Sequence, residues 1–570
     1  MNLTSAVSYF PLNSMLPNSP LSTARHLILE HFFFSSSGYA LVLDRQSPLW
    51  LSLVPATTNS QNAKLCIKTD ATRSPYNNSR ANTTEVNSIR FSVYASRNIR
   101  SLYDALSGNS LGGAFQVISR PSTLPAPQLL SYPSWLVTAG RSKFFAEESD
   151  FNTEKVIQFS EVLKQNGYLH NLIMLDSGWQ WDVARPGNPW ASFYKGAFSN
   201  PKWLTTRVHD NTQKLGLLIE PYLSTLGWDF KDHRDFFVKS KANAGGKFTA
   251  AAEGPLKDRA LFDVTNEAAV RFMADRVNSL VKENEVDFLE LASIRTALDG
   301  AVVQLNRSEE VPGSGSSTLF SQRYLLHLST ALNQAAGRPI TTIVQEGHET
   351  QALSSFVRIS PRTSDWAGLR SVIPTVLSLS IAGYSFILPD IVGGSVPVKS
   401  ATNQENGIYP FFFTERELFI RWTQAVAFMP ALQFATPPWE YDDGPNVPEK
   451  NKDTANLVQK VLAKRVLLAR DLLVRLANLR QQSGAPIIRP LWYRWPEDEH
   501  AYLIDDQFMV GDALLVAPVL ERGATGRSVY LPRGKWKAEQ GQAGQVEHMG
   551  PVTVWVDAPL EVVPCFTLII

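Results

Sequence analysis

The sequence predicts an α/β fold organised around a (β/α)8 TIM barrel, with an N-terminal β-sandwich portion and a C-terminal β-sandwich domain. Three observations support this prediction. The 570 residues exceed what one hydrophobic core usually organises, so smaller domains around a large central one are expected. The middle of the chain alternates short apolar runs with helical patterns, which is typical of a barrel. Both flanks instead show short strands and turns. The predicted domains are 1–125, 126–484 and 485–570.

The N-terminal portion contains short apolar runs separated by Asn-rich and Ser-rich segments. The runs cover 39–43, 48–54 and 89–94. Runs of this length, bounded by turn-forming residues, predict β-strands joined by long loops. The Pro-rich run 120–132 that follows predicts a linker to the central domain.

Seven candidate barrel strands lie in the middle of the chain, which matches a (β/α)8 barrel to within one strand. Helical patterns separate them, for example 154–165, where Val156, Phe159 and Leu163 share one face and Gly167 predicts the end. The candidate strands cover 135–138, 172–175, 216–223, 286–292, 339–344, 355–359 and 384–388.

The uncharged stretch 371–389 is long enough to raise the question of a membrane span. Pro374, Gly383 and several serines interrupt it. It therefore predicts a barrel helix to about residue 382 followed by a short strand.

The C-terminal part begins after a long amphipathic helix, predicted for 453–480 and ended by Gly484 and Pro486. Only strand and turn patterns follow, which predict a β-domain. The candidate strands there are 489–495, 501–503, 513–519, 528–531 and 552–556.

Composition narrows the class of partner. The chain has 54 basic and 53 acidic side chains, so no large net charge favours nucleic acid or an anionic membrane. Fourteen Trp residues fit sugar recognition, although aromatic residues more often fill a core. Cys66 and Cys565 provide neither a disulfide framework nor a cysteine metal site, and the histidines form no spaced ligand set. We therefore predict no metal and no other cofactor. The first thirty residues lack a signal-peptide pattern, so we expect either a cytosolic protein or a start that is not the native one.

Several carboxylates follow candidate barrel strands. Asp176, Glu220, Asp365 and Asp390 lie at or near strand ends. In a (β/α)8 barrel the active site lies at the C-terminal ends of the strands. Hydrolysis of a glycosidic bond needs two carboxyl groups about 5 to 9.5 Å apart, one to protonate the leaving oxygen and one to attack or to activate water. The region therefore has the residue type that this chemistry requires.

Residues 381–394, IAGYSFILPDIVGG, form a motif in the barrel that resembles the strand and loop of glycoside hydrolase family 31 that end in Asp-Ile-Gly-Gly. Similar segments also lie at 421–424, 428–434, 437–441, 505–512, 515–519 and 530–536. The chain looks most like an α-galactosidase-like branch found in animals, and its residues 35–38 suggest that it begins partway into the family's N-terminal β-sandwich. The resemblance implies hydrolysis of O-glycosyl bonds in α-linked carbohydrates and a location in the lumen of the secretory pathway.

The resemblance also implies residues that contact the sugar. Asp176, Asp390 and Trp439 match substrate-binding positions, and the two carboxylates can accept hydrogen bonds from hydroxyl groups. The alternative for each aspartate is that it only satisfies backbone groups at a strand end. Two other positions differ from the family, because an expected acid falls on Met174 and an expected arginine falls on Glu349.

The nucleophile position is substituted. The family pattern resembles Val-Asp-x-Phe-Lys-Phe-Asp-Ala-Gly-Glu, and residues 286–295, VDFLELASIR, match it without gaps and place Ala292 at the nucleophile. A methyl group cannot attack an anomeric carbon. Glu290 is the best substitute because residues two apart on a strand face the same side, but it lies about 6 to 7 Å deeper. The alternative is that Glu290 is a polar residue of the barrel interior, paired with a base.

The acid/base position also differs from the family pattern, which resembles Arg-x-x-Asp-x-Asp-Ser-x-Trp. Aligning Arg358 and Trp366 with it places Pro361 and Thr363 at the two acidic positions. Asp365 lies two residues later, so a small shift in register would restore it as the acid.

Three functions follow from these observations. The first is a degenerate family member that keeps the barrel and sugar binding but has lost hydrolysis. The second is an active retaining α-glycosidase that uses Asp365 and a relocated carboxylate. The third is a non-catalytic scaffold or folding partner that uses only the barrel surface.

Overall fold

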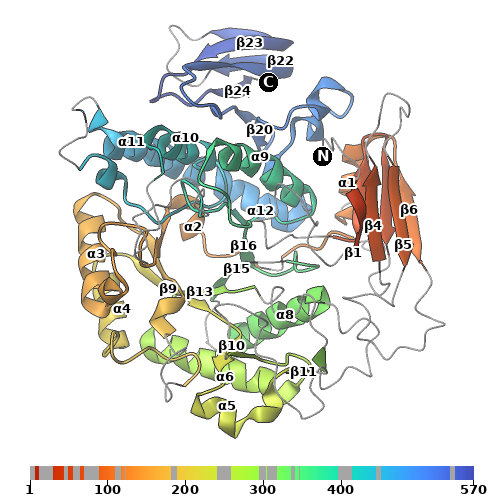
Figure 1. The fold of residues 1–570 in the computed structure, drawn as a ribbon. Helices are drawn as coiled ribbons and strands as arrows, with labels where there is room; N and C mark the ends of the chain where they lie inside the picture. Colours follow the sequence, from red (N-terminus) through yellow and green to blue (C-terminus); the bar gives the residue numbers. More distant parts are fainter. Residues whose placement is uncertain are drawn as a thin grey trace.

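Eight parallel strands form the central sheet of the protein in a computed structural model (Figure 1). Their order is β17-β16-β15-β13-β9-β8-β7-β18. Beyond β17, the backbone N–H of Val392 donates to the carbonyl of Gln433 in β18 at 2.8 Å, so the sheet is a nearly closed barrel. The strands are β7 (Ser134–Val137), β8 (Leu172–Leu175), β9 (Lys214–Ile219), β13 (Phe288–Leu291), β15 (Thr341–Val344), β16 (Ser355–Arg358), β17 (Ile387–Leu388) and β18 (Gln433–Phe434).

The structure describes most of the chain. The described residues are 7–11, 30–43, 49–54, 64–69, 89–108, 117–121, 123–180, 189–240, 259–293, 303–304, 317–335, 340–345, 347–395, 414–443, 448, 451–538 and 546–569.

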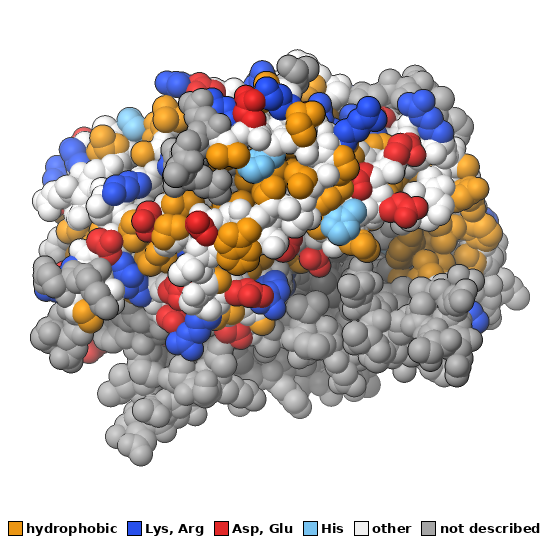
Figure 2. All heavy atoms as spheres, turned by 90° about the horizontal axis from the view of Figure 1, so that it is seen from above, with side chains coloured by type: hydrophobic (Ala, Val, Ile, Leu, Met, Phe, Trp, Pro, Cys, Tyr) orange, Lys and Arg blue, Asp and Glu red, His pale blue; other side chains and the backbone are white. Residues whose placement is uncertain are grey.

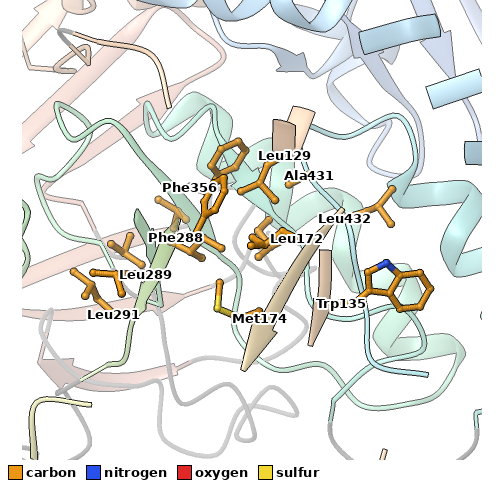
Figure 3. Packing of buried hydrophobic residues seen from close by; sticks show 14 of the residues in the cluster. Leu129, Trp135, Leu172, Met174, Phe288, Leu289, Leu291, Phe356, Ala431 and Leu432 are labelled. Atoms are coloured by element: carbon orange, nitrogen blue, oxygen red, sulfur yellow. The ribbon is translucent and has the colours of Figure 1, made fainter. Parts of the chain in front are cut away.

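One level of the barrel interior is apolar. Met174, Gly216 and Phe288 lie at one level, because their Cα atoms pair across β8, β9 and β13. A Cβ on Gly216 would lie 2.7 Å from the Met174 methyl carbon, so a larger residue there would require this side chain to shift. Figure 3 shows Met174 and Phe288 in this core. The methionine found where the family resemblance predicts an acid is therefore a packed core residue.

Helices cover the outside of the barrel. The predicted face of α3 (Thr153–Gln165) is confirmed, since Val156, Phe159 and Leu163 are buried. This helix starts where the Asn152 side chain accepts from the N–H of Lys155. The other main helices of the barrel are α4 (Pro201–Asp210), α6 (Glu267–Asn284), α8 (Ser317–Ala335), α9 (Trp366–Ile381) and α10 (Arg416–Val426).

Two barrel predictions need correction. The strand predicted for 216–223 is interrupted at Pro221, which has no backbone N–H to donate. Its first part is β9, and its second part is β10 (Tyr222–Ser224), which pairs with β12 (Arg259–Leu261) outside the barrel. The eighth strand, β18, was not among the predicted strands because two residues carry no detectable alternation.

The stretch 371–389 forms part of α9 and then β17, as predicted. Among the described residues, no helix is both long and apolar enough to cross a membrane.

The described residues of the N-terminal portion form two small antiparallel sheets. One has the order β1-β4-β5, with β1 (Val7–Pro11), β4 (Leu49–Val54) and β5 (Lys64–Thr69). The other has the order β2-β3-β6, with β2 (Phe32–Ser35), β3 (Tyr39–Leu43) and β6 (Phe91–Ala95). Helix α1 (Ile99–Leu106) follows them, and the predicted linker includes the short helix α2 (Gln128–Ser131). Figure 1 shows these sheets at one side of the barrel.

The predicted long helix at the end of the barrel is present and contains a π-helical turn. It runs through α11 (Thr454–Leu468), the π-turn η7 (Ala469–Leu473) and α12 (Val474–Ser483). Gly484 ends it in a left-handed conformation with φ of 79°, which glycine adopts without strain.

The C-terminal domain is one six-stranded antiparallel sheet with the order β19-β20-β21-β24-β22-β23. The strands are β19 (Ile488–Arg489), β20 (Phe508–Val510), β21 (Leu514–Val516), β22 (Gly526–Ala538), β23 (Glu547–Asp557) and β24 (Cys565–Ile569).

On the face of the molecule seen in Figure 2, acidic and basic side chains are interspersed and neither sign gathers into one patch.

Two strands predicted in this domain are wrong. The segment 489–495 leaves the sheet at Pro490 and forms the 3-10 turn η8 (Leu491–Tyr493). The segment 501–503 falls largely in the 3-10 turn η9 (His500–Tyr502), because the Asp498 carboxylate accepts from the N–H groups of His500 and Ala501. In both places a local hydrogen bond or a proline decides the conformation.

Candidate active site

A cavity of about 730 Å³ opens at the C-terminal ends of three neighbouring barrel strands. Thr138 follows β7, Asp176 follows β8 and Glu220 follows β9, and all three line it. Its volume is within the range of small-molecule sites. The cavity therefore lies where a barrel enzyme binds its substrate.

Besides the exposed Glu148, two carboxylates line this cavity. Asp176 accepts a hydrogen bond from the N–H of Ser177 at 2.8 Å and another from the Thr138 hydroxyl. Glu220 forms an ion pair with Arg259 at 2.9 Å. Burial raises the pKa of both carboxyl groups, and the negative charge of Asp176 raises that of Glu220 further. Carboxylates with raised pKa values in a cavity are typical of functional sites.

Aromatic side chains complete the wall. Trp190, Tyr194 and Tyr222 line the cavity, as does Phe151. The Trp190 indole is held in place, because its Nε1–H donates to the carbonyl of Glu220 at 3.0 Å. Aromatic rings beside carboxylates offer an apolar surface and hydrogen-bond acceptors together, which suits a sugar ring and its hydroxyl groups.

The predicted nucleophile position lies just after β13 and outside the cavity lining. Ala292 follows the strand and is buried. Glu290, two residues earlier, is paired with a base: its two oxygens accept from Nε and Nη2 of Arg358 at 2.6 and 2.7 Å. Gln345 donates to the same carboxylate at 2.8 Å, and Arg358 also donates to Gln433. Glu290 is thus at the centre of a hydrogen-bonded network across four barrel strands.

The segment predicted to hold the acid/base position leads into α9. Asp365 is the N-cap of this helix, and its Oδ1 accepts from the N–H of Gly368 at 2.7 Å and from the Thr363 hydroxyl at 2.9 Å. A Cβ on Gly368 would lie 1.9 Å from the carbonyl oxygen of Thr363, so the turn admits only glycine there. Thr363 and Asp365 therefore hydrogen-bond each other at a helix start.

Asp390 is surrounded by local donors. Its carboxylate accepts from the N–H groups of Arg362, Ile391 and Ser395 and from the Ser395 hydroxyl. Burial raises the pKa of Asp390, and these hydrogen bonds oppose that rise. The carboxylate thus satisfies backbone groups after β17.

Trp439 lies in the aromatic layer outside the barrel strands. Its ring lies 6.2 Å from that of Trp135 and 5.8 Å from that of Tyr168, measured between centroids. Of the predicted site residues, only Asp176 lines the cavity; Glu290, Ala292, Thr363, Asp365, Asp390 and Trp439 do not.

Sequence reasoning missed several residues that line the cavity. Trp190, Tyr194 and Arg259 lie on loops and on β12, where no motif marks them. Glu220 was noticed as a strand end but matches no catalytic position of the family. The clue to its role is its position after β9, the strand next to β8, which Asp176 follows.

One group of described residues has the composition of a metal site. His31, His348 and Glu349 offer ligand atoms that lie within 4.8 Å of one another. None of them lines the cavity.

Comparisons with known proteins agree with this architecture. The family description "Glycosyl hydrolases family 31 TIM-barrel domain" matches residues 131–469, and "Glycosyl hydrolase family 31 C-terminal domain" matches residues 484–567. The myogenesis-regulating glycosidase of Mus musculus is 32% identical over 433 residues, which cover 74% of this chain and 54% of that protein. The chain thus spans about half the length of this relative.

Two further similarities extend over nearly the whole chain. The SITS-binding protein of Tetronarce californica is 25% identical over 567 residues, covering 95% of this chain and 70% of that protein. The crystal structure of a GH31 alpha-xylosidase from a soil metagenome, complexed with xylose, superposes with a TM-score of 0.73 at 16% identity, covering 99% of this chain and 75% of that chain. At this identity the similarity to the xylosidase establishes the fold.

Proposed function

Because this chain belongs to glycoside hydrolase family 31, we propose that it binds an α-linked glycoside at the mouth of its barrel and does not hydrolyse it by the family's two-carboxylate mechanism. One observation carries the proposal. The cavity is lined by Asp176 and Glu220 beside aromatic rings, whereas the family resemblance places Ala292 and Thr363 at the two catalytic positions.

The nearest replacement carboxylates have other roles in this proposal. Glu290 is held in a bidentate ion pair below the mouth, and Asp365 caps α9. A nucleophile needs an accessible oxygen lone pair, and a general acid must reach the leaving oxygen. Both side chains are engaged elsewhere.

Binding is supported by the chemistry of the cavity wall. Asp176 can accept from sugar hydroxyls, and charged acceptors form stronger hydrogen bonds than neutral ones. Tyr222 and Tyr194 add phenol groups and ring surface. We propose a carbohydrate as the partner of this chain. The family resemblance also favours a location in the lumen of the secretory pathway. The proposed domains are 1–125, 126–484 and 485–570.

Isothermal titration calorimetry with methyl α-galactoside and methyl α-glucoside tests binding. We expect one of them to bind the wild-type chain, and Asp176→Asn to weaken it about tenfold, since a hydrogen bond to a charged group contributes about 1.5 kcal/mol or more. Asp365→Asn is the matched control, because it removes a carboxylate that does not line the cavity. Absence of binding to the wild type, or equal weakening by both substitutions, would contradict the proposal and favour a scaffold role.

A second function is favoured by the pair of carboxylates in the cavity. Asp176 and Glu220 follow adjacent strands, and burial raises the pKa of each, which suits a carboxyl group that acts as a general acid. An active glycosidase with relocated carboxylates would turn over nitrophenyl α-glycosides and would lose that turnover in Asp176→Asn or Glu220→Gln. The ion pair of Glu220 with Arg259 favours binding over this alternative.

A further inference from the structure

Two histidines and a glutamate from distant parts of the chain meet beside the barrel. His31 immediately precedes β2 of the N-terminal portion, whereas His348 and Glu349 lie in the loop after β15. Both histidines are buried, at 5% and 3% exposure, and the Glu349 side chain is 10% exposed. The two imidazole rings lie 4.8 Å apart at 63°, and Nε2 of His348 lies 4.0 Å from Oε1 of Glu349.

The backbone of Glu349 is held in an uncommon conformation. Its φ is +53°, in the left-handed region that residues other than glycine, asparagine and aspartate rarely adopt. The carboxylate of Glu30 stabilises this conformation by accepting from the N–H of Glu349 at 3.0 Å, and the same oxygen accepts from the Tyr384 hydroxyl. Strained backbone that surrounding contacts enforce is common at ligand sites.

The Glu349 side chain is also oriented. Gln322 of α8 donates to its Oε2 at 3.1 Å, so Oε1 is the oxygen turned toward His348. Metal-binding carboxylates are commonly held by such a second hydrogen bond, which fixes one oxygen and presents the other.

We propose that His31, His348 and Glu349 bind one divalent transition-metal ion of the zinc type. Two imidazoles and one carboxylate are a ligand set that Zn²⁺ adopts when a fourth position is left to water. Bonds of about 2.0 to 2.1 Å in a tetrahedral site place ligand atoms about 3.4 Å apart. The present ligand atoms lie within 4.8 Å of one another, so small side-chain rotations bring them to an ion.

Such an ion links the N-terminal portion to the barrel. The loop after β15 that carries His348 also contains Gln345, which donates to Glu290 and accepts from the N–H of Ser293, the neighbour of Ala292. Binding of the metal therefore fixes a loop that reaches the barrel interior. The ion acts as a clamp between two parts of the molecule rather than as a group in the cavity.

Zinc binding by the full-length chain tests this proposal in the absence of any sugar, so its outcome is independent of glycoside binding. After dialysis against a chelator, the protein is titrated with zinc chloride, and bound zinc is measured by mass spectrometry and by competition with a chromogenic chelator. We expect one zinc per chain, and we expect His348→Asn and Glu349→Gln each to weaken binding about tenfold or more. The matched control is His500→Asn, an exposed histidine of η9, which is expected to bind zinc as the wild type does.

Two results would overturn the proposal: a wild type that binds no zinc, or variants that bind it as tightly as the wild type. Far-UV circular dichroism establishes whether each variant is folded. Should His348→Asn not fold, the wild type loaded with Co²⁺ provides the decision. Intense visible bands of tetrahedral cobalt support the site, and their absence contradicts it.

Discussion

Glu290 and Arg358 are two opposite charges inside the barrel, and their contact explains why a carboxylate remains beside Ala292. Both carboxylate oxygens accept from the guanidinium, and both side chains are at most 10% exposed. Although burial alone lowers the pKa of Arg358, attraction to Glu290 raises it overall. Each of these two buried ions therefore needs the other as its partner.

Replacing Glu290 with glutamine is expected to destabilise the protein. The substitution leaves the Arg358 charge buried without its partner, which costs about 3 to 5 kcal/mol in the free energy of unfolding. Urea denaturation of Glu290→Gln measures this loss. The matched control is Glu267→Gln, which breaks an exposed pair with Arg271 and is expected to cost less than about 1 kcal/mol. Equal effects of the two substitutions would contradict the structural role of Glu290.

Glu440 makes stability depend on pH. Burial raises its pKa from 4.5 to about 7, although the backbone N–H groups of Lys143 and Phe144 oppose the rise. Between pH 4.5 and 7 the folded state therefore holds a proton that the unfolded state has lost, so stability falls as the pH rises. Relative to Glu440→Gln, the wild type is expected to lose about 3 kcal/mol across this window and no more above it. Denaturant unfolding at several pH values checks this, and parallel pH profiles for the two proteins would refute it.

The chemical types of these residues could be predicted from the sequence, but their partners could not. The spacing of Glu290 and Ala292 on one strand indicated either a substitute nucleophile or a paired interior residue. The choice depends on Arg358, which comes from another strand and meets Glu290 only when the barrel closes. For the same reason, no pattern along the chain brings His31 together with His348.

Helix α9 bears on whether Asp365 can act as a general acid, because Asp365 is the N-cap of this helix. The carboxylate caps the helix and also accepts from the Thr363 hydroxyl, so the residue at the predicted acid/base position supports the cap. A capping role and a catalytic role make different demands. A cap needs an oxygen acceptor, whereas a general acid needs a proton.

Two substitutions of Asp365 separate these roles. Asparagine caps helices about as well as aspartate, so Asp365→Asn is expected to keep the thermal stability of the wild type. Asp365→Ala removes the acceptor and is expected to cost about 1 kcal/mol. Calorimetric unfolding compares the three proteins. Equal stability of Asp365→Ala and the wild type would show that the cap contributes nothing.

Periodic elements were predicted well, and elements fixed by single residues were not. The buried face of α3 follows from its helical spacing. The interruption at Pro221 and the turn held by Asp498 depend on one side chain each, in segments whose apolar content also suits a strand. The two-residue strand β18 is defined by its neighbour β7 rather than by its own sequence.

At the scale of the whole molecule, the barrel and the C-terminal sheet are joined through buried side chains of α10. Arg421 donates to the carbonyl oxygens of Ala524 and Ala558, with longer contacts to Pro559 and Val562. Gln424, one turn further along the helix, donates to the carbonyl of Leu560. One helix thereby satisfies several backbone groups at the edge of the C-terminal domain.

Replacing Arg421 with methionine is expected to loosen this junction. The change keeps much of the apolar stem but leaves the buried carbonyl group of Ala558 without this donor, at a cost of about 1 kcal/mol or more. We expect a lower unfolding temperature and faster proteolysis in the segment 557–564. Arg522→Met, which alters an exposed arginine at the same junction, is the control. Unchanged proteolysis in Arg421→Met would show that the domains are held by other contacts.

The barrel and the C-terminal domain could be predicted from the sequence because each follows from motifs or periodicity, whereas the substituted nucleophile stays a prediction. The composition of the cavity did not, because Trp190, Glu220 and Arg259 become neighbours only through the loops and β12. The chain belongs to glycoside hydrolase family 31, and the activities in its relatives' names are those of the relatives. The activity of this chain is therefore decided by its own carboxylates.

Turnover of nitrophenyl α-galactoside and α-glucoside by the wild-type chain tests the central claim most directly. We expect no release of nitrophenol above the buffer rate, while the calorimetric titration detects binding of the methyl glycoside. Removing a general acid or base lowers a hydrolytic rate about 10²- to 10⁴-fold. Saturable turnover by the wild type, lost to that extent in folded Asp365→Asn, Asp176→Asn or Glu220→Gln, would contradict the claim that this barrel binds glycosides without hydrolysing them.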